Sequence, residues 1–210
     1  MQLEQIYLYR MTHIDNIPHI LQYGITHRNS PNANPNFKSI GDSSLINYRS
    51  TYTFTVKEQE HCLGDFIPFY FGVRMPMLYV IQHGGNLVPQ ATPPEDIVYI
   101  VIPLSNIIQD RALEYYFTNG HATDALTHIY DRQSINELPI LLDWTAIRSV
   151  SWGGPDNLDI KRAKQAEFLV KGDIPSQHIK GFVCYNDIAK HRLNSFGVTH
   201  LIKVSPQSYY

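Results

Sequence analysis

The hydrophobic positions of this chain fall into short runs that turn-forming residues interrupt. The clearest run is IVYIVIP at 97–103, whose β-branched and aromatic residues are typical of a strand buried on both faces. Shorter runs of the same kind predict further strands. These are expected at 6–9, 66–71, 147–152, 166–170, 179–184 and 198–204.

Helical periodicity is clearest at 16–23, where Ile17, Ile20 and Leu21 share one face and Gly24 follows as a stop signal. We expect Thr12 or Asp15 to cap this helix. A second short helix is expected to end the apolar segment 63–79, and NSPNANPN at 29–36 predicts a loop. Many short strands with few short helices indicate an α+β fold, and the length of the chain suits a single domain over 1–210.

Composition excludes several classes of protein. With 43% hydrophobic and 17% charged residues the chain is globular, and no apolar stretch approaches the roughly 20 residues of a membrane helix. The first residues lack the pattern of a signal peptide, so a cytoplasmic location is expected. A net charge of -2 means that any DNA binding needs a local basic groove. The 12% of aromatic residues fit either aromatic strands or a surface that stacks bases.

Familiar catalytic and metal-binding patterns do not occur in the sequence. There is no GxGxxG, GxxxxGK[ST], HExxH or GxSxG. Cys62 and Cys184 have no CxxC spacing and are expected to be free thiols. His121 and His128 would lie on one side of a helix but about 10 Å apart, too far for one metal ion. We therefore expect ordinary histidines and no metal.

A few polar residues stand inside apolar segments and are candidates for chemistry. They are Arg10 with Thr12 after the first strand, Arg49, Arg74 and Glu167. Glu167 opens the apolar run at 166–170 directly after the basic run KRAK at 161–164. The pattern alone fits a catalytic carboxylate and an outward-facing strand position equally well.

Several short segments, in one order along almost the whole chain, resemble the DarT family of DNA ADP-ribosyltransferase toxins. They are THIDNIP at 12–18 followed by Gly24, IPFYF at 67–71 with MPMLY at 75–79, FTNGHA at 117–122, DW at 143–144, Trp152, QAEFLV at 165–170 and YY at 209–210. Each segment is weak evidence by itself, but together and colinear they are a specific signal.

The resemblance implies the ADP-ribosyltransferase fold, in which two small packed β-sheets form an NAD cleft flanked by short helices. It implies that Glu167 and Arg49 are the catalytic pair. The residues that it places against NAD are Arg10, Met11, Thr12, His19, His27 and Arg49. Residues 31–48 correspond to the segment that folds over NAD, and residues 118–166 to the loop that recognises the substrate.

Arg10 departs from the histidine that many relatives have at this position. Its guanidinium can hold a phosphate or ribose oxygen through two hydrogen bonds, so NAD binding is expected to survive the exchange. The exchange bears on the subfamily and therefore on the modified base. Thymine is favoured and guanine stays open.

The implied activity is transfer of ADP-ribose from NAD, as a co-substrate, onto a base of single-stranded DNA. Expected DNA contacts are Arg74, Met77, Lys161, Arg162 and Lys164. The expected protein partner is a DarG-like macrodomain antitoxin; no membrane and no metal are involved. Two alternatives stay open: an ADP-ribosyltransferase that modifies a protein side chain or an RNA end, and a non-catalytic nucleic-acid-binding module.

Overall fold

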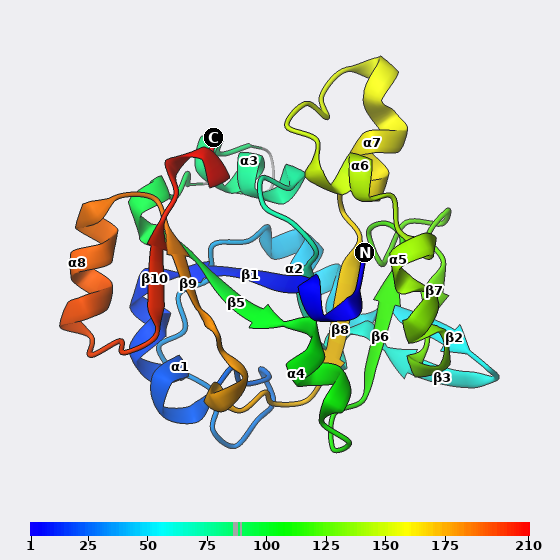
Figure 1. Ribbon diagram of the computed structural model, residues 1–210, viewed down its shortest axis with the longest axis horizontal. Helices are drawn as coiled ribbons and strands as arrows, with labels where there is room; N and C mark the ends of the chain where they lie inside the picture. Colours follow the sequence, from blue (N-terminus) through cyan, green and yellow to red (C-terminus); the bar gives the residue numbers. More distant parts are fainter. Residues whose placement is uncertain (86–87, 89) are drawn as a thin grey trace.

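A computed structural model describes residues 1–85, 88 and 90–210 (Figure 1). Eight strands form one sheet in the order β10-β9-β5-β1-β4-β8-β6-β7, and β2 and β3 form a separate hairpin. The strands are β1 (Tyr7–His13), β2 (Thr53–Val56), β3 (Gln59–Cys62), β4 (Phe66–Tyr70), β5 (Ile97–Pro103), β6 (Tyr115–Thr118), β7 (Ile129–Tyr130), β8 (Glu167–Lys171), β9 (Gly181–Cys184) and β10 (Leu201–Val204).

The large sheet consists of two halves that meet at one residue pair. β1 pairs with β5 along its whole length, from Tyr7↔Pro103 to His13↔Ile97, but it pairs with β4 only at Tyr9↔Tyr70. On each side of that pair the two halves separate. The expected α+β fold is confirmed, with the two expected small sheets joined into one sheet by this single contact.

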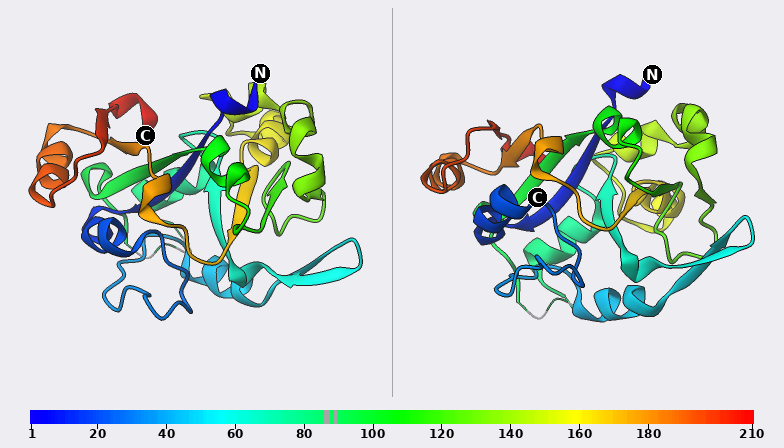
Figure 2. Two further views of the ribbon diagram at one scale, coloured as in Figure 1. Left: turned by 60° about the horizontal axis from the view of Figure 1, so that its bottom comes forward. Right: turned by 90° about the horizontal axis from the view of Figure 1, so that it is seen from below.

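The helices are short and surround the sheet (Figure 2). They are α1 (Ile17–Tyr23), α2 (Ser43–Thr51), α3 (Pro76–His83), α4 (Leu104–Gln109), α5 (Leu138–Leu141), α6 (Trp144–Arg148), α7 (Leu158–Ala163) and α8 (Asp187–Ser195). In Figure 1, α8 lies beside β10 at one end of the sheet, and the β2–β3 hairpin projects beyond the other end.

The central strands are buried on both faces, as the apolar run at 97–103 predicts. Leu8, Phe69, Phe117 and Phe168 are fully buried in one cluster that extends across β1, β4, β6 and β8. Burial of each such side chain contributes roughly 1.5–3 kcal/mol to the free energy of unfolding. The first residue of β8 thus lies beside the main hydrophobic core.

α1 begins one residue later than expected, and neither Thr12 nor Asp15 caps it. A single turn of 3-10 helix, Ile14–Asn16, precedes it, and the side chain of His13 caps that turn by accepting the N–H of Asp15 at 3.1 Å. The helix ends at Gly24 as expected, with φ of 81°. A Cβ at Gly24 would lie 2.2 Å from the carbonyl oxygen of Ile174, so only glycine fits.

Two local expectations are wrong. Residues 147–152 form no strand; α6 ends at Arg148 and irregular backbone follows, because Asp143 caps a helix by accepting the N–H of Ala146 at 2.9 Å. His121 and His128 lie on no common helix. His121 belongs to a turn, and His128 directly precedes β7.

Candidate active site

Glu167 is the first residue of β8 and is completely buried. Its Cα partner in the sheet is Tyr70, the last residue of β4, and its N–H donates to Thr118 Oγ1 at 2.9 Å. The alternative of an outward-facing strand position is therefore wrong, because other chain segments cover this end of the strand. A buried carboxylate is costly unless a cation or several donors satisfy it.

Arg49 supplies that cation. Its two terminal nitrogens donate to the two oxygens of Glu167, Nη1 to Oε1 at 2.9 Å and Nη2 to Oε2 at 2.8 Å. Burial opposes the charge on Arg49, but the Glu167 carboxylate outweighs it and keeps the pKa of Arg49 raised. The result is a planar, two-bond ion pair whose members are 118 residues apart in sequence.

The position of Arg49 follows from the cap of α2. Asp42 is buried, and its Oδ1 accepts the N–H groups of Ser44 at 2.9 Å and Leu45 at 3.0 Å. This fixes the first turn of a helix none of whose own residues is buried. Arg49 stands in its last turn and reaches from there to Glu167.

His121 and Tyr70 complete the polar cluster around the ion pair. The Nε2 of His121 lies 3.4 Å from Arg49 Nη1 and 3.6 Å from Glu167 Oε1, and its Nδ1 lies 2.9 Å from the Thr123 hydroxyl. Burial lowers the pKa of His121, so the ring is neutral at pH 7. Burial, and then the Glu167 charge, raises the pKa of Tyr70.

The cluster was only partly predicted from the sequence. His121 was expected to be an ordinary histidine, and no role was assigned to Tyr70. The available signal was their place in two of the segments that carry the family resemblance, FTNGHA and IPFYF.

A cavity of about 180 Å³ is lined by Arg49 of the ion pair, whereas Glu167 lies buried behind that guanidinium and does not line it; we call it the catalytic cavity. Its lining residues come from β1, the segment before α2, α2 itself, β4 and α3, with one loop histidine. They are Arg10, Met11, Thr12, Phe37, Ser39, Ile40, Gly41, Asp42, Leu45, Ile46, Arg49, Pro68, Tyr70, Met77, Ile81 and His121. The three β1 residues and part of the 31–48 segment thus line the same cavity as Arg49. Their contact with NAD stays a prediction.

A larger cavity of about 510 Å³ is a neighbour of the catalytic cavity. The two share residues 39–41, and the larger one is lined also by His13, Lys38 and Thr92 among others. Ligand cavities in proteins commonly have volumes of roughly 300–1,000 Å³. The catalytic cavity alone is small for a dinucleotide, whereas the larger neighbouring cavity lies within this range.

Hydrogen bonds hold the segment between the two cavities in place. The side-chain amide of Asn16 donates to the carbonyl of Lys38 and its oxygen accepts the N–H of Lys38, both at 2.9 Å. The same amide donates to Thr12 Oγ1 at 2.9 Å. Thr12 therefore lines the catalytic cavity and, through Asn16, also helps to hold Lys38 in place.

Arg10 lies deep in the catalytic cavity and donates from Nη1 to the carbonyl of Pro68 at 3.0 Å. Burial lowers the pKa of Arg10 to about 10, so it is still charged at neutral pH. Its remaining N–H groups can meet a ligand oxygen.

Two histidines expected to contact NAD line neither cavity. On α1, the ring of His19 packs against that of Tyr23, with centroids 4.8 Å apart and the planes tilted by 37°. His27 bonds through Nε2 to the carbonyl of Gly64, and its N–H donates to Asp173 at 2.6 Å. The contacts of His27 connect loops, whereas His19 contacts a residue of its own helix. Contact of these two side chains with NAD stays a prediction.

The residues expected to contact DNA are dispersed. Met77 lines the catalytic cavity, whereas Arg74 lines a different one. Lys161 is exposed, with Nζ 5.9 Å from the centre of the Trp152 ring, and Arg162 Nη1 donates to the carbonyl of Asn119 at 3.4 Å.

Lys164 is not available to a phosphate, which corrects the expectation for this residue. It is 4% exposed, and its Nζ donates to the carbonyls of Ile147 at 2.8 Å and Val73 at 3.2 Å. Burial, and then the charge of Arg74, lowers the pKa of Lys164 to about 8. The side chain ties the end of α6 to the turn after β4, beside the start of β8.

Replacement of Lys164 by methionine is expected to lower the free energy of unfolding by roughly 2 kcal/mol, because two carbonyls lose their donor. Urea unfolding measures the change. Lys161→Met is the matched control, since that exposed side chain should change stability by less than about 0.5 kcal/mol. Equal losses for the two variants would contradict the role given to Lys164.

The lowered pKa of His121 predicts a pH dependence of stability. Between that lowered pKa and the ordinary value of about 6.5, the unfolded chain binds more protons than the folded one. Stability should therefore fall as the pH drops below about 6.5. His121→Gln should weaken this fall in urea titrations at several pH values, and replacement of the exposed His191 by Gln should not. A steeper fall in His121→Gln would contradict the assignment.

In the residues that the structure describes, no three His, Cys, Asp or Glu side chains form a group that could hold a metal ion. In the same residues, every helix is too short or too polar to cross a membrane. Cys62 and Cys184 are both free, as expected.

Known proteins resemble this chain in sequence and in fold. Residues 9–210 match the family described as "ssDNA thymidine ADP-ribosyltransferase, DarT". A DNA ADP-ribosyl transferase of Thermus sp. (strain 2.9) is 32% identical over 181 residues, which are 85% of this chain and 81% of that protein.

Solved structures of the Thermus sp. 2.9 DarT have the same fold. The structure in complex with ADP-ribosylated ssDNA is 27% identical, with a TM-score of 0.81 over 99% of this chain and 97% of that chain. The structure in complex with NAD+ has a TM-score of 0.78 at 26% identity and covers 99% of this chain and 98% of that chain.

One relative is about twice as long as the matched region. It is a DNA ADP-ribosyl transferase-DNA ADP-ribosyl glycohydrolase fusion protein of Thermosipho africanus, 27% identical over 187 residues. These residues are 88% of this chain and 44% of that protein.

Proposed function

Because the chain belongs to the DarT family of single-stranded DNA thymidine ADP-ribosyltransferases, we propose that it transfers ADP-ribose from NAD to a thymine of single-stranded DNA. The observation that carries the assignment of its active site is the buried ion pair of Arg49 and Glu167 beside the catalytic cavity. Thymine is favoured over guanine by the description of the family.

Glu167 acts on the ribose. When the bond between ribose C1 and the nicotinamide nitrogen breaks, nicotinamide leaves as a neutral molecule and positive charge develops on the sugar, as in glycoside cleavage. A carboxylate fixed next to the sugar stabilises that charge. Burial strengthens the effect, since the site is screened from water.

Arg49 acts in two ways. It holds the Glu167 carboxylate in one orientation through two hydrogen bonds, and it presents positive charge to the catalytic cavity. A ring nitrogen of the base attacks ribose C1 and loses its proton, which Glu167 accepts as a general base. Arg49 favours this loss by stabilising negative charge on the base.

NAD occupies the catalytic cavity and the larger neighbouring cavity that shares residues 39–41 with it. Arg10 binds a phosphate or ribose oxygen, Met11 and Thr12 contact the dinucleotide, and the segment before α2 covers it. His121 lies close enough to the ion pair to contact the ribose. No step requires a metal ion.

The remaining assignments concern the wider context. Met77 borders the target base, and Arg74, Lys161 and Arg162 meet the phosphates of the strand. Residues 1–210 act as one domain in the cytoplasm, where NAD and DNA are both present. By analogy with the Thermosipho fusion protein, the partner is a DarG-like macrodomain that removes ADP-ribose from DNA.

Incubation of the protein with NAD labelled in the adenosine half tests the acceptor class. Single-stranded DNA, RNA and protein are offered in parallel, and the oligonucleotides contain either thymine or guanine as the sole candidate base. We expect label on thymine-containing DNA only. Label on RNA or protein alone would favour the alternative acceptors, and label on none of them would favour a non-catalytic module.

A further inference from the structure

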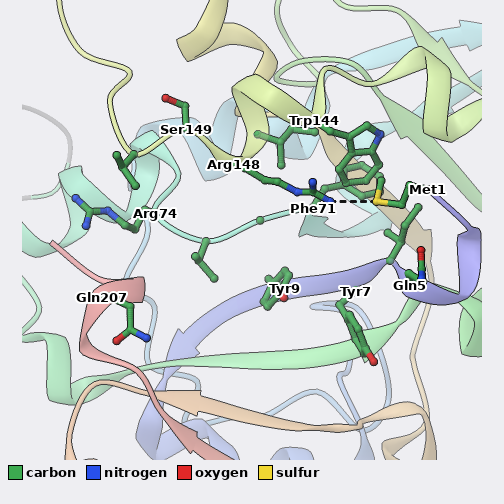
Figure 3. Close-up of a pocket in the computed structure, with 15 residues that line it drawn as sticks. Met1, Gln5, Tyr7, Tyr9, Phe71, Arg74, Trp144, Arg148, Ser149 and Gln207 are labelled. Atoms are coloured by element: carbon green, nitrogen blue, oxygen red, sulfur yellow. Dashed lines mark hydrogen bonds between the residues drawn. The ribbon is translucent and has the colours of Figure 1, made fainter.

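A second cavity, separate from the catalytic one, lies where β1 and the chain after β4 separate (Figure 3). Its volume is about 290 Å³. Tyr9, whose sheet partner Tyr70 lines the catalytic cavity, lines this one. The two cavities share no lining residue, and they flank the single pair that joins the halves of the sheet.

The lining of this cavity is aromatic and cationic. Tyr7, Tyr9, Phe71 and Trp144 provide rings, and Arg74 and Arg148 provide the charge, as Figure 3 shows. Gln5, Ser149 and Gln207 add polar groups, and none of the 15 residues drawn in Figure 3 as its lining is acidic. We call it the arginine–aromatic cavity.

Both arginines lie against aromatic rings, and the side chain of Arg148 is exposed. The guanidinium of Arg74 lies 4.5 Å from the centre of the Tyr210 ring, and that of Arg148 lies 5.8 Å from the centre of the Trp144 ring. In the described part of the chain, the buried Nε of Arg74 has no hydrogen-bond partner. Arg148 donates only to the sulfur of Met1 there, at 3.2 Å, a weak acceptor.

The backbone fixes Arg74 at the rim. Its φ is 56°, in the left-handed region that side chains other than glycine seldom adopt. The hydroxyl of Tyr99 accepts the N–H of Arg74 at 3.2 Å, and the hydroxyl of Tyr210 donates to its carbonyl. These contacts hold the residue in an unfavourable conformation, so its direction is set by the surrounding structure.

From this geometry we propose that the arginine–aromatic cavity binds a nucleotide of the DNA strand next to the modified one. Rings that stack a base, with arginines that meet its phosphate, are the general means of holding single strands. A volume near the lower limit for ligand cavities suits one base better than a dinucleotide. The proposal rests on the proposed function, since it assumes a single-stranded DNA substrate.

Binding of fluorescent single-stranded oligonucleotides in the absence of NAD tests the proposal. Each oligonucleotide carries one candidate thymine, and an abasic residue replaces one flanking nucleotide at a time. Wild type is expected to lose roughly tenfold in affinity at one flanking position. Tyr7→Val removes an exposed ring and keeps a strand-forming residue. It should bind the intact strand as weakly as wild type binds the strand with the abasic residue at that position, and an abasic residue there should weaken its binding no further.

Arg148→Gln provides a second, independent variant, because Arg148 is exposed and should be dispensable for folding. It should reduce the slope of log Kd against log salt concentration by about 0.7, the value for one phosphate contact on a single strand. Matched controls are Arg111→Gln, in an exposed turn, and Tyr23→Leu, whose ring is 45% exposed on α1. Neither control residue lines this cavity.

The proposal is overturned if both cavity variants keep the abasic profile and salt slope of wild type. It is also overturned if the control variants change the abasic profile and the salt slope as much as the cavity variants do. Transfer of ADP-ribose by wild type is measured in parallel on the same oligonucleotides. If wild type transfers ADP-ribose but the variants keep the wild-type abasic profile, only the proposal for this cavity is wrong. If wild type transfers to no oligonucleotide, the proposed function is wrong.

Discussion

Replacement of Glu167 by glutamine is expected to lower the rate of ADP-ribose transfer by roughly 10²–10³-fold, the usual cost of losing one group that stabilises developing charge. Glutamine retains the shape and can still accept a hydrogen bond from Arg49, but it lacks the negative charge that the ribosyl cation requires. Single-turnover rates at saturating NAD measure the effect on the chemical step.

The control for this variant is Glu60→Gln, on an exposed position of β3. It makes the same change of charge away from the site and should transfer at the wild-type rate. NAD affinity of Glu167→Gln should change much less than its rate, because the carboxylate acts chiefly in the transition state. A variant that bound NAD poorly but transferred at the normal rate would contradict the role of Glu167.

Arg49→Ala is expected to have the second-largest effect, on both activity and stability. The carboxylate of Glu167 would stay buried without its partner, which commonly costs about 3–5 kcal/mol. Transfer should fall more than NAD affinity, since the role that we propose for Arg49 is to orient the carboxylate of Glu167. Steady-state kinetics and urea unfolding measure the two effects separately.

A double variant distinguishes these contributions. Arg49→Ala combined with Glu167→Gln removes the unpaired charge and should regain part of the lost stability without regaining activity. Arg28→Ala, at an exposed position, serves as the single-arginine control. If Arg49→Ala raised only the KM for NAD and left kcat unchanged, Arg49 would be a binding residue alone.

The central strands could be predicted because they are buried, and their sequences are therefore runs of apolar residues. β5 has the expected bounds, and β8 differs from the expected run by one residue at each end. α2 could not be predicted in the same way, since none of its residues is buried and no apolar face identifies it. The cap by Asp42 and the ion pair of Arg49 hold it instead.

The candidate site shows a similar division. The family resemblance identified Glu167 and Arg49, but no local pattern indicates that residues 118 positions apart meet at 2.8–2.9 Å. His121 belongs to a turn, where periodicity gives no information about burial. Lys164 follows α7 in a basic run that resembles a solvated surface, yet its ammonium group reaches two interior carbonyls.

Intact mass spectrometry of a thymine-containing single-stranded oligonucleotide, incubated with NAD and then isolated, tests the central claim most directly. Wild type should add the mass of one ADP-ribose, and fragmentation should place it on the thymine base. Glu167→Gln, folded as judged by its unfolding curve, should add almost none in the same time. An equal yield of modified oligonucleotide from both proteins would contradict the account.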